Sequence, residues 1–313
     1  MENPTEIATY LGYAAGWRSV RWMPDRAAYS MFDQLADQLW RRQGAGVKQL
    51  QRNLRRVVPD ADEAEIREIS RLGMRSYFRY WCDAFRLPDW SENQILDTFR
   101  MGNKQVLDEA VESGTGAIVA LPHAGNWDHA GAYASLSWNG IVSVAEDLKP
   151  ERLTKKFLEF RETLGMEIIT LAPGQDVFSE LVKRLDRGKV VALLGDRDLT
   201  ASGVPVDFFG ETTRMPAGPA ALAARTGAPL FTATLYYDGP LAVADISDPI
   251  PVSTHADKDA AVRVTTQALA DRIASGIAEH PQDWHMMQRL WLADLDQSRL
   301  KASRYDDPAS GSG

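Results

Sequence analysis

The sequence predicts an α/β fold in which a mainly parallel central sheet is flanked by helices on both faces, with an N-terminal helical region. From about residue 115, short apolar runs alternate with helical stretches, which indicates strands joined by covering helices. Before that point, the apolar positions recur at helical spacing. The composition, 44% hydrophobic and 25% charged over 313 residues, is that of a globular chain able to bury a substantial core.

The N-terminal third is expected to form successive helices. Periodic segments lie near residues 5–17, 27–42, 46–57 and 61–86. Residues that do not favour a helix interior separate or close these segments: Pro24, the stretch Gly44-Ala45-Gly46, Pro59 and Pro88. We therefore expect residues 1–100 to form a helical region. Its basic and aromatic content indicates that this region faces a membrane.

This helical region carries local positive charge inside an acidic chain. The net charge of -8 argues against a general nucleic-acid role. Between Trp17 and Arg56, however, nine Lys and Arg residues stand against three Asp. They are interleaved with large apolar side chains: Trp17, Trp22, Met23, Met31, Phe32 and Trp40. This composition is typical of a segment on an anionic membrane surface, and the alternative is an amphipathic helix pair packed on the core.

Cysteine usage and hydropathy limit the cellular setting. The single cysteine, Cys82, excludes an internal disulfide, fits a reducing compartment and is expected to be a buried thiol. We expect no transmembrane helix, because no run of about 18 apolar residues occurs. The acidic start, residues 1–6, lacks the apolar region of a signal peptide.

The rest of the chain is expected to be one integrated α/β core at residues 101–305, followed by a flexible tail at 306–313. The predicted strands are 116–121, 141–145, 167–171, 190–194, 229–236 and 241–246. The predicted helices are 127–136, 151–164, 176–187, 216–226 and 257–279.

The most informative motif is a histidine and an aspartate five positions apart, His123 and Asp128, on a strand-to-helix turn. The turn through residues 124–126 can bring the two side chains together, so that Asp128 accepts the Nδ1 proton of His123. Nε2 is then able to take a proton from a hydroxyl, which is the base half of a triad whose nucleophile comes from the substrate. The alternative is a structural hydrogen bond.

A second motif follows the next central strand. Asp196 and Arg197 come directly after the predicted strand at 190–194. Ligands of open parallel sheets bind beyond the carboxyl ends of the strands, so both motifs can line one cleft. Asp196 is then a second partner for His123, and Arg197 and Ser202 are candidates to hold a phosphate or thioester group. The alternative is a loop whose acids bond its own backbone.

Three further residues are candidates for substrate contacts. Glu146 follows the strand at 141–145, and Arg161 lies in the helix at 151–164, where it can face the same cleft. A structural ion pair is the alternative for both. Arg214 precedes a helix with Pro216 at an early position, and free N–H groups there make a plausible phosphate or oxyanion site.

Other classes of site receive little support. His123, Asp128 and His129 lack a second carboxylate or Cys cluster, so no metal is expected. The absence of a G-x-S-x-G elbow counts against a serine hydrolase. The remaining histidines, expected to be surface or capping residues, are His255, His280 and His285.

The motif His123-x4-Asp128, with the downstream run Val206–Gly210 and a Pro/Gly-rich helix start, resembles the bacterial lipid A biosynthesis acyltransferase family. That family belongs to the wider glycerolipid-type acyltransferases. Further stretches resemble its actinobacterial branch, which acylates phosphatidylinositol mannosides: Leu11–Arg18, Tyr80-Trp81, Ala84–Pro88, Arg197–Thr200 and Asp283–Met286.

The resemblance implies transfer of an acyl chain, typically palmitoyl, from coenzyme A to the 6-hydroxyl of a mannose of phosphatidylinositol mannosides. It implies His123 as the base with Asp128 as its orienting partner, Glu146 and Arg161 in the active-site cleft, and Ser202 near the donor. Acyl-CoA is then a co-substrate, no cofactor is needed, and the enzyme is peripheral to the inner leaflet at the cytoplasmic face of the plasma membrane.

Two residues depart from that branch. Asp196 stands where the branch carries Glu, and Arg225 where it carries an acid. The shorter Asp196 side chain keeps the charge and loses reach, which leaves open whether it contacts His123.

Three other functions remain open from the sequence. The same histidine and aspartate serve acylation of another glycolipid or a lysophospholipid. A hydrolase would deliver the acyl group of acyl-CoA to water. A non-catalytic lipid-binding or scaffolding protein would use only the basic N-terminal helices.

Overall fold

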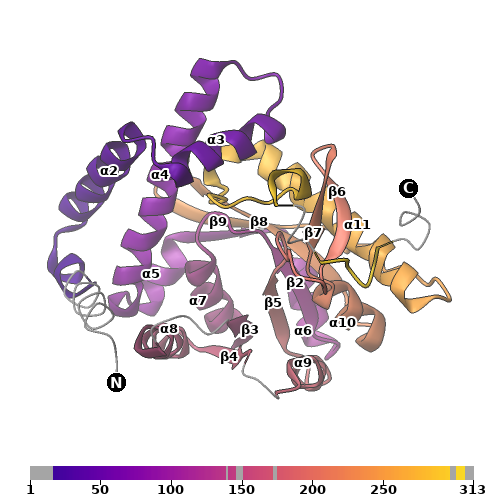
Figure 1. The fold of residues 1–313 in the computed structure, drawn as a ribbon. Helices are drawn as coiled ribbons and strands as arrows, with labels where there is room; N and C mark the ends of the chain where they lie inside the picture. Colours follow the sequence, from indigo (N-terminus) through magenta and orange to yellow (C-terminus); the bar gives the residue numbers. More distant parts are fainter. Residues whose placement is uncertain (1–16, 139, 146–150, 172–174, 297–300, 307–313) are drawn as a thin grey trace.

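A computed structural model describes residues 17–138, 140–145, 151–171, 175–296 and 301–306, with side chains from residue 155 in the third range. Its centre is a seven-stranded sheet in the order β1-β9-β8-β2-β5-β3-β4 (Figure 1). The strands are β1 (Phe99–Gly102), β2 (Ala117–Leu121), β3 (Ile141–Ala145), β4 (Met166–Thr170), β5 (Val190–Leu194), β8 (Leu230–Asp238) and β9 (Leu241–Ile246). Only β8 and β9 pair antiparallel in this sheet, which confirms the predicted mainly parallel α/β fold.

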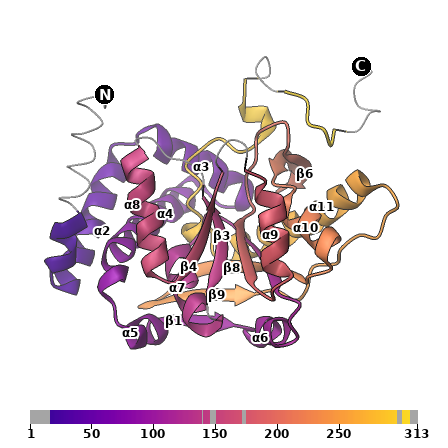
Figure 2. The same cartoon turned by 90° about the horizontal axis from the view of Figure 1, so that it is seen from below.

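Helices cover both faces of the sheet, as Figure 2 shows. One face is covered by α9 (Val177–Leu185), α10 (Gly218–Thr226) and α11 (Lys258–Glu279). The other is covered by α6 (Gln105–Glu112), α7 (Trp127–Trp138) and α8 (Glu151–Thr163). The central strand β2 is buried throughout, because Ile118 and Ala120 face the first layer while Val119 and Leu121 face the second.

The N-terminal helices form a separate layer beside the sheet (Figure 1). They are α2 (Asp25–Arg41), α3 (Ala45–Val57) and α4 (Glu63–Arg86), with residues 17–22 also helical. The start of α4 is set by a capping box, in which Asp62 accepts from the Glu65 N–H and the Glu65 side chain accepts from the Asp62 N–H. The helices predicted at 27–42, 46–57 and 61–86 are confirmed within three residues, whereas 5–16 lie outside the described residues.

The aromatic residues of this region divide between core and surface. Trp17 and Phe32 are buried in the core and therefore do not face a membrane, whereas Trp22 is 76% exposed. Cys82 is buried as predicted, and burial raises the pKa of its thiol to about 12. Within the described part of the chain, no helix is long and apolar enough to span a bilayer.

Short elements escaped the sequence analysis. They are the strand β1, the helix α5 (Glu92–Asp97), the antiparallel hairpin of β6 (Val204–Phe208) and β7 (Glu211–Met215), and the 3-10 turns η1 (Leu87–Asp89), η2 (Pro281–Asp283) and η3 (Leu292–Asp294). Strands such as Glu-Thr-Thr-Arg-Met are too short and polar to give an apolar run.

Candidate active site

The two predicted motifs meet because the strands that carry them are neighbours. Strands β2 and β5 pair in parallel with Leu121 opposite Leu194. The Gly195 N–H extends this pairing by one residue, donating to the Leu121 carbonyl at 2.8 Å. His123 and Asp196 each lie two residues beyond their strand, so both emerge at the carboxyl edge of the sheet, where α/β proteins place their ligands.

Asp196 binds His123 at two nitrogen atoms, Nδ1 of the ring and the backbone N. Nδ1 of the ring lies 2.6 Å from Asp196 Oδ1, and the His123 backbone N–H donates to Oδ2 at 3.0 Å. Trp284 Nε1 donates to the same Oδ2 at 3.1 Å. The direct contact with His123, which the shorter aspartate left open, is therefore present. We call this pair the His123–Asp196 dyad.

Asp196 is fully buried, yet it is held in the charged form. Burial raises the pKa of its carboxyl, but the charge of His123 and the hydrogen bonds from His123 and Trp284 outweigh burial and lower the pKa below its usual value. A carboxylate bonded at Nδ1 selects the tautomer whose Nε2 carries the lone pair.

The predicted pairing of His123 with Asp128 is wrong in this structure. The hydrogen bonds of Asp128 among the described residues run to the Tyr80 hydroxyl and to Arg161 Nε, each at 2.8 Å. The reason is local: Gly125 turns the chain with a φ of +51°, and α7 begins at Trp127. As a first-turn residue of α7, Asp128 is directed toward α4 and α8.

Asp128 and Arg161 form a nearly buried ion pair. Their side chains are 1% and 22% exposed, and the charge of Asp128 raises the pKa of Arg161 despite the opposing effect of burial. The structural ion pair considered for Arg161 is therefore present, with Asp128 as its partner. Tyr80 of α4 completes the arrangement, and sequence reasoning missed it because α4 lies far from the motif in the chain.

A narrow apolar cavity opens beside this ion pair. It lies between α7 and the sheet, with Asp128 and Arg161 in its wall and side chains such as Val119 and Ile168 along its length. Met166, which also lines the cavity, packs directly against Gly131, because a Cβ atom there would lie 2.5 Å from Met166 Sδ. The cavity is therefore an apolar slot that begins at a fixed charge pair.

A segment from late in the chain supports the His123 turn. The Gly125 N–H donates to the Asp283 carbonyl at 2.9 Å, and the His285 N–H donates to the His123 carbonyl at 2.8 Å. Between them, Ala124 and Trp284 form an antiparallel bridge. In the sequence, this segment was indicated only by the resemblance of Asp283–Met286 to the family, because the segment does not follow a predicted strand.

The expectation that His285 is a surface or capping residue is wrong. Its side chain is buried, its Nε2 lies 2.9 Å from Ser76 Oγ, and its Nδ1 has no hydrogen-bond partner among the described residues. Burial, with a smaller contribution from the charge of His123, lowers the pKa of His285 to about 3. His285 is therefore a neutral, buried side chain beside the site.

The loop after β5 places Arg197 and Ser202 in different surroundings. Arg197 follows Asp196 directly, and its Nε donates to the Arg289 carbonyl at 3.4 Å. Ser202 is exposed, 2.6 Å from Thr200 Oγ1, and Asp198 accepts from the Thr200 N–H at 3.0 Å. The alternative of an acid bonding its own loop thus describes Asp198, and the substrate contacts of Arg197 and Ser202 stay predictions.

Arg214 has a structural role that the sequence did not suggest. It lies in β7, is 4% exposed, and its Nη1 donates to the Lys301 carbonyl at 2.8 Å, while Nη2 lies 3.3 Å from Asp306. These contacts hold the C-terminal stretch and leave no support for the predicted phosphate site. Glu146, the last predicted substrate contact, lies outside the described residues.

His129 is buried beside the site and its Nε2 lies 2.9 Å from the Ile95 carbonyl; burial lowers its pKa to about 4. No group of three potential metal ligands occurs among the residues that the structure describes. The arrangement is suited to general-base chemistry, because a histidine is held by a buried carboxylate just beyond strand ends that line an apolar slot.

The sequence is also similar to those of known acyltransferases. Residues 1–293 match the model of the family described as bacterial lipid A biosynthesis acyltransferase. A phosphatidylinositol mannoside acyltransferase of Mycolicibacterium smegmatis is 43% identical over 93% of this chain and 94% of its own length. One of Mycobacterium tuberculosis is 44% identical over 94% of this chain and 92% of its own. The chain therefore belongs to the bacterial lipid A biosynthesis acyltransferase family and is an O-acyltransferase.

Proposed function

We propose that this enzyme transfers a long acyl chain, palmitoyl in the first instance, from acyl-CoA to the 6-hydroxyl of a mannose in phosphatidylinositol mannosides. His123 acts as the general base, and the hydroxyl attacks the thioester directly within a ternary complex. The observation that carries the proposal is the His123–Asp196 dyad, which follows two strands whose last residues, Leu121 and Leu194, line the apolar slot. The printed names of relatives similar over nearly the whole chain support the acceptor.

The proton transfers that the reaction requires favour direct transfer of the acyl group to the hydroxyl. A sugar hydroxyl is a weak nucleophile at neutral pH and needs a base, whereas a thioester carbonyl is already electrophilic. Nε2 of His123 takes the hydroxyl proton while the new ester bond forms, and the imidazolium is stabilised by Asp196. The C–S bond then breaks and the proton passes to the departing thiolate, so no covalent enzyme intermediate is needed.

The oxyanion formed in this step needs donors near His123. The backbone N–H groups of His123, Ala124 and Gly125 already bond within the fold, to Asp196, Pro122 and Asp283 respectively. We therefore assign the oxyanion to the start of α7, where the first N–H groups of a helix have no intrahelical acceptor and, among the described residues, only the third, that of His129, is taken by Asn126 Oδ1. The acyl chain enters the slot next to it, where each buried methylene contributes about 0.8 kcal/mol.

We also propose that the N-terminal helices rest on the cytoplasmic face of the plasma membrane. Trp22, Met31 and Leu35 are 76%, 39% and 40% exposed, and Arg18 and Arg26 are exposed among them. Exposed apolar and basic side chains together suit an anionic bilayer surface. The double variant with Arg18→Glu and Trp22→Ser should lose sedimentation with anionic vesicles, whereas unchanged sedimentation would contradict this placement.

The decisive assay is acyl transfer from palmitoyl-CoA to purified mono- and dimannosylated phosphatidylinositol, followed by mass spectrometry. Wild type should give a mono-acylated product, and His123→Ala should give none above background while remaining folded. His255→Ala is the matched control, because His255 is an exposed capping residue before α11. Product from His123→Ala at a near-normal rate would overturn the base assignment.

The same assay separates the competing functions. Thioester turnover that does not change when mannoside is added would indicate a hydrolase. Turnover that rises with a different glycolipid or a lysophospholipid, and not with mannoside, would replace the acceptor while leaving the reaction class intact.

A further inference from the structure

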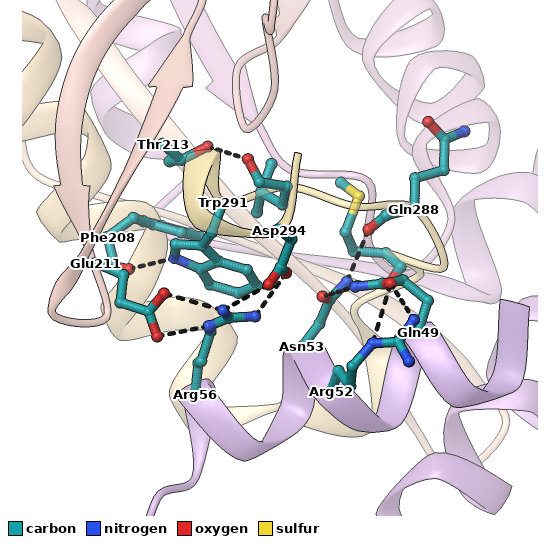
Figure 3. Close-up of polar contacts among 12 residues, drawn as sticks. Gln49, Arg52, Asn53, Arg56, Phe208, Glu211, Thr213, Gln288, Trp291 and Asp294 are labelled. Carbon is teal, nitrogen blue, oxygen red and sulfur yellow. Dashed lines mark hydrogen bonds and ion pairs between the residues drawn. The ribbon is translucent and has the colours of Figure 1, made fainter. Parts of the chain in front are cut away.

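The segment that supports the dyad is itself held by a helix of the N-terminal layer. We define the supporting segment as residues 284–288. Trp284 of this segment donates to Asp196, and the His285 N–H donates to the His123 carbonyl. Asn53, on α3, donates from Nδ2 to the Met286 carbonyl at 2.7 Å and to the Gln288 carbonyl at 2.9 Å (Figure 3). A contact path therefore runs from α3 to the dyad.

We propose that Asn53 is a positioning residue for acyl transfer. By giving both of its amide hydrogens to the supporting segment, it sets where Trp284 and His285 lie, and through them the position of Asp196 and His123. The inference rests on the proposed function, because it names a residue that acts on the same dyad. A small displacement of a base from its reacting proton lowers the rate without removing the site.

The environment of Asn53 fits one orientation of its amide. The side chain is fully buried, and its Oδ1 accepts from Gln49 Nε2 at 2.8 Å. A flipped amide would place Oδ1 against two carbonyl oxygens and Nδ2 against another amide nitrogen, so the flip is excluded by the partners. Arg52 in turn donates to Gln49 Oε1 from Nη2, at 2.5 Å. Figure 3 shows the three side chains in sequence on α3.

Apolar and ionic contacts keep α3 in place around Asn53. Met287, between the two carbonyls that Asn53 binds, packs on the buried cluster that includes Leu50 and Leu54. One turn further, Arg56 pairs with Glu211 at 2.8 Å and with Asp294 at 2.8 Å (Figure 3). Loss of the Asn53 donors therefore leaves the helix docked and releases two carbonyls of the supporting segment.

The first test compares Asn53→Leu with Gln51→Leu. Gln51 is the matched control because it is a buried amide of the same helix whose Nε2 donates to Ser70 Oγ on α4, at 3.2 Å, away from the supporting segment. We expect Asn53→Leu to lower kcat about tenfold to a hundredfold, with KM for acyl-CoA and mannoside unchanged. Gln51→Leu should change kcat by less than about twofold at similar thermal stability.

Hydrogen exchange supplies a readout that does not depend on activity. In Asn53→Leu, the amide of His285 should exchange faster than in wild type, because the strand-like pairing with His123 is loosened. The same amide in Gln51→Leu should keep its wild-type rate. Equal losses of kcat in both variants, or full kcat in Asn53→Leu, would overturn the proposal.

A milder variant covers the case in which Asn53→Leu does not fold. Gln49→Leu removes the donor that orients the Asn53 amide, together with the acceptor of Arg52, and leaves both Asn53 donors in place. It should therefore give a smaller loss of kcat, again without a change in KM. Unchanged kcat and unchanged exchange at His285 in Gln49→Leu would then count against positioning. If wild type itself does not acylate mannosides, the acceptor proposal fails, while the exchange comparison still decides whether Asn53 holds the supporting segment.

Discussion

Two regions beside the His123 turn each contribute a buried aspartate, and they use it differently. The loop after β5 gives Asp196 to a histidine whose side chain is 36% exposed. The first turn of α7 gives Asp128 to Arg161, inside the wall of the apolar slot. One carboxylate therefore serves the histidine proposed as the base, and the other is paired with a cation that keeps its charge.

The difference shows what determines a partner at the edge of a parallel sheet. Strands β2 and β5 are hydrogen-bonded neighbours, so residues the same distance beyond their ends meet although 73 positions separate them in the chain. Residues five positions apart across a helix start do not meet, because the helix directs the second one elsewhere. Adjacency of strands outweighs proximity in sequence.

The comparison is tested most severely by Asp196→Asn. The amide keeps the shape but favours the wrong tautomer of His123 and cannot stabilise the imidazolium, so kcat should fall by about a thousandfold or more. Asp198→Asn, in the same loop, should retain at least half of the wild-type kcat. The measurement is acyl transfer under saturating substrates. A mutant within tenfold of wild type would show that the two aspartates do not differ as described.

Asp128→Asn tests the other side of the comparison. It leaves Arg161 with an uncompensated charge in a largely buried place, so the free energy of unfolding should fall by about 3 kcal/mol. Its kcat should fall less than that of Asp196→Asn, because Asp128 does not touch His123. Urea unfolding at pH 7 measures the first effect. Asp186→Asn, at the exposed end of α9, is the control and should leave stability unchanged.

Trp284→Phe sharpens the account of Asp196. Loss of one hydrogen bond to a charged group should lower the free energy of unfolding by about 2 kcal/mol. The pKa of Asp196 is lowered in the fold, so the stability from its ionised form is present above about pH 4 and is lost as the pH falls through the folded pKa. The gap between wild type and variant should therefore be full at pH 6 and should narrow below pH 4. A gap of constant size would show that Trp284 acts through packing alone.

Gly131→Ala should have the smallest effect, and it concerns the slot that begins at Asp128. The new methyl group would displace the Met166 side chain, since a Cβ atom at Gly131 would lie only 2.5 Å from Met166 Sδ. Preference among acyl-CoA substrates should shift toward shorter chains, by about 0.8 kcal/mol for each methylene excluded. Competition between acyl-CoAs of different length measures the shift, and an unchanged preference would place the acyl chain elsewhere.

Much of the fold followed from local pattern. The central strands and most helices were predicted because buried parallel strands give continuous apolar runs and amphipathic helices give a clear period. The expectation that His123 and Asp196 line one cleft also followed, since both come after such strands, whereas their direct contact was left open. The antiparallel course of β9 did not, because an apolar run contains no information on strand direction.

The partners of the site residues were harder to predict for a physical reason. Tyr80 and Trp284 reach the site, and Asn53 reaches the supporting segment, from helices or loops whose docking depends on packing of the whole chain. A tyrosine in α4 has the same local pattern whether its hydroxyl binds Asp128 or water. The structural role of Arg214 was missed for the same reason, because its partners lie at residues 301 and 306.

The supporting segment also has a consequence for biosynthesis. Trp284 meets Asp196 across 88 positions, and Asn53 meets Met286 across 233. Contacts between residues so far apart form late, and a chain emerging from the ribosome exposes its N-terminal helices first. During translation, the basic helices are thus available to a bilayer before the histidine is completed as a base. Under the proposed placement on a bilayer, the nascent enzyme reaches that surface while it is still catalytically silent.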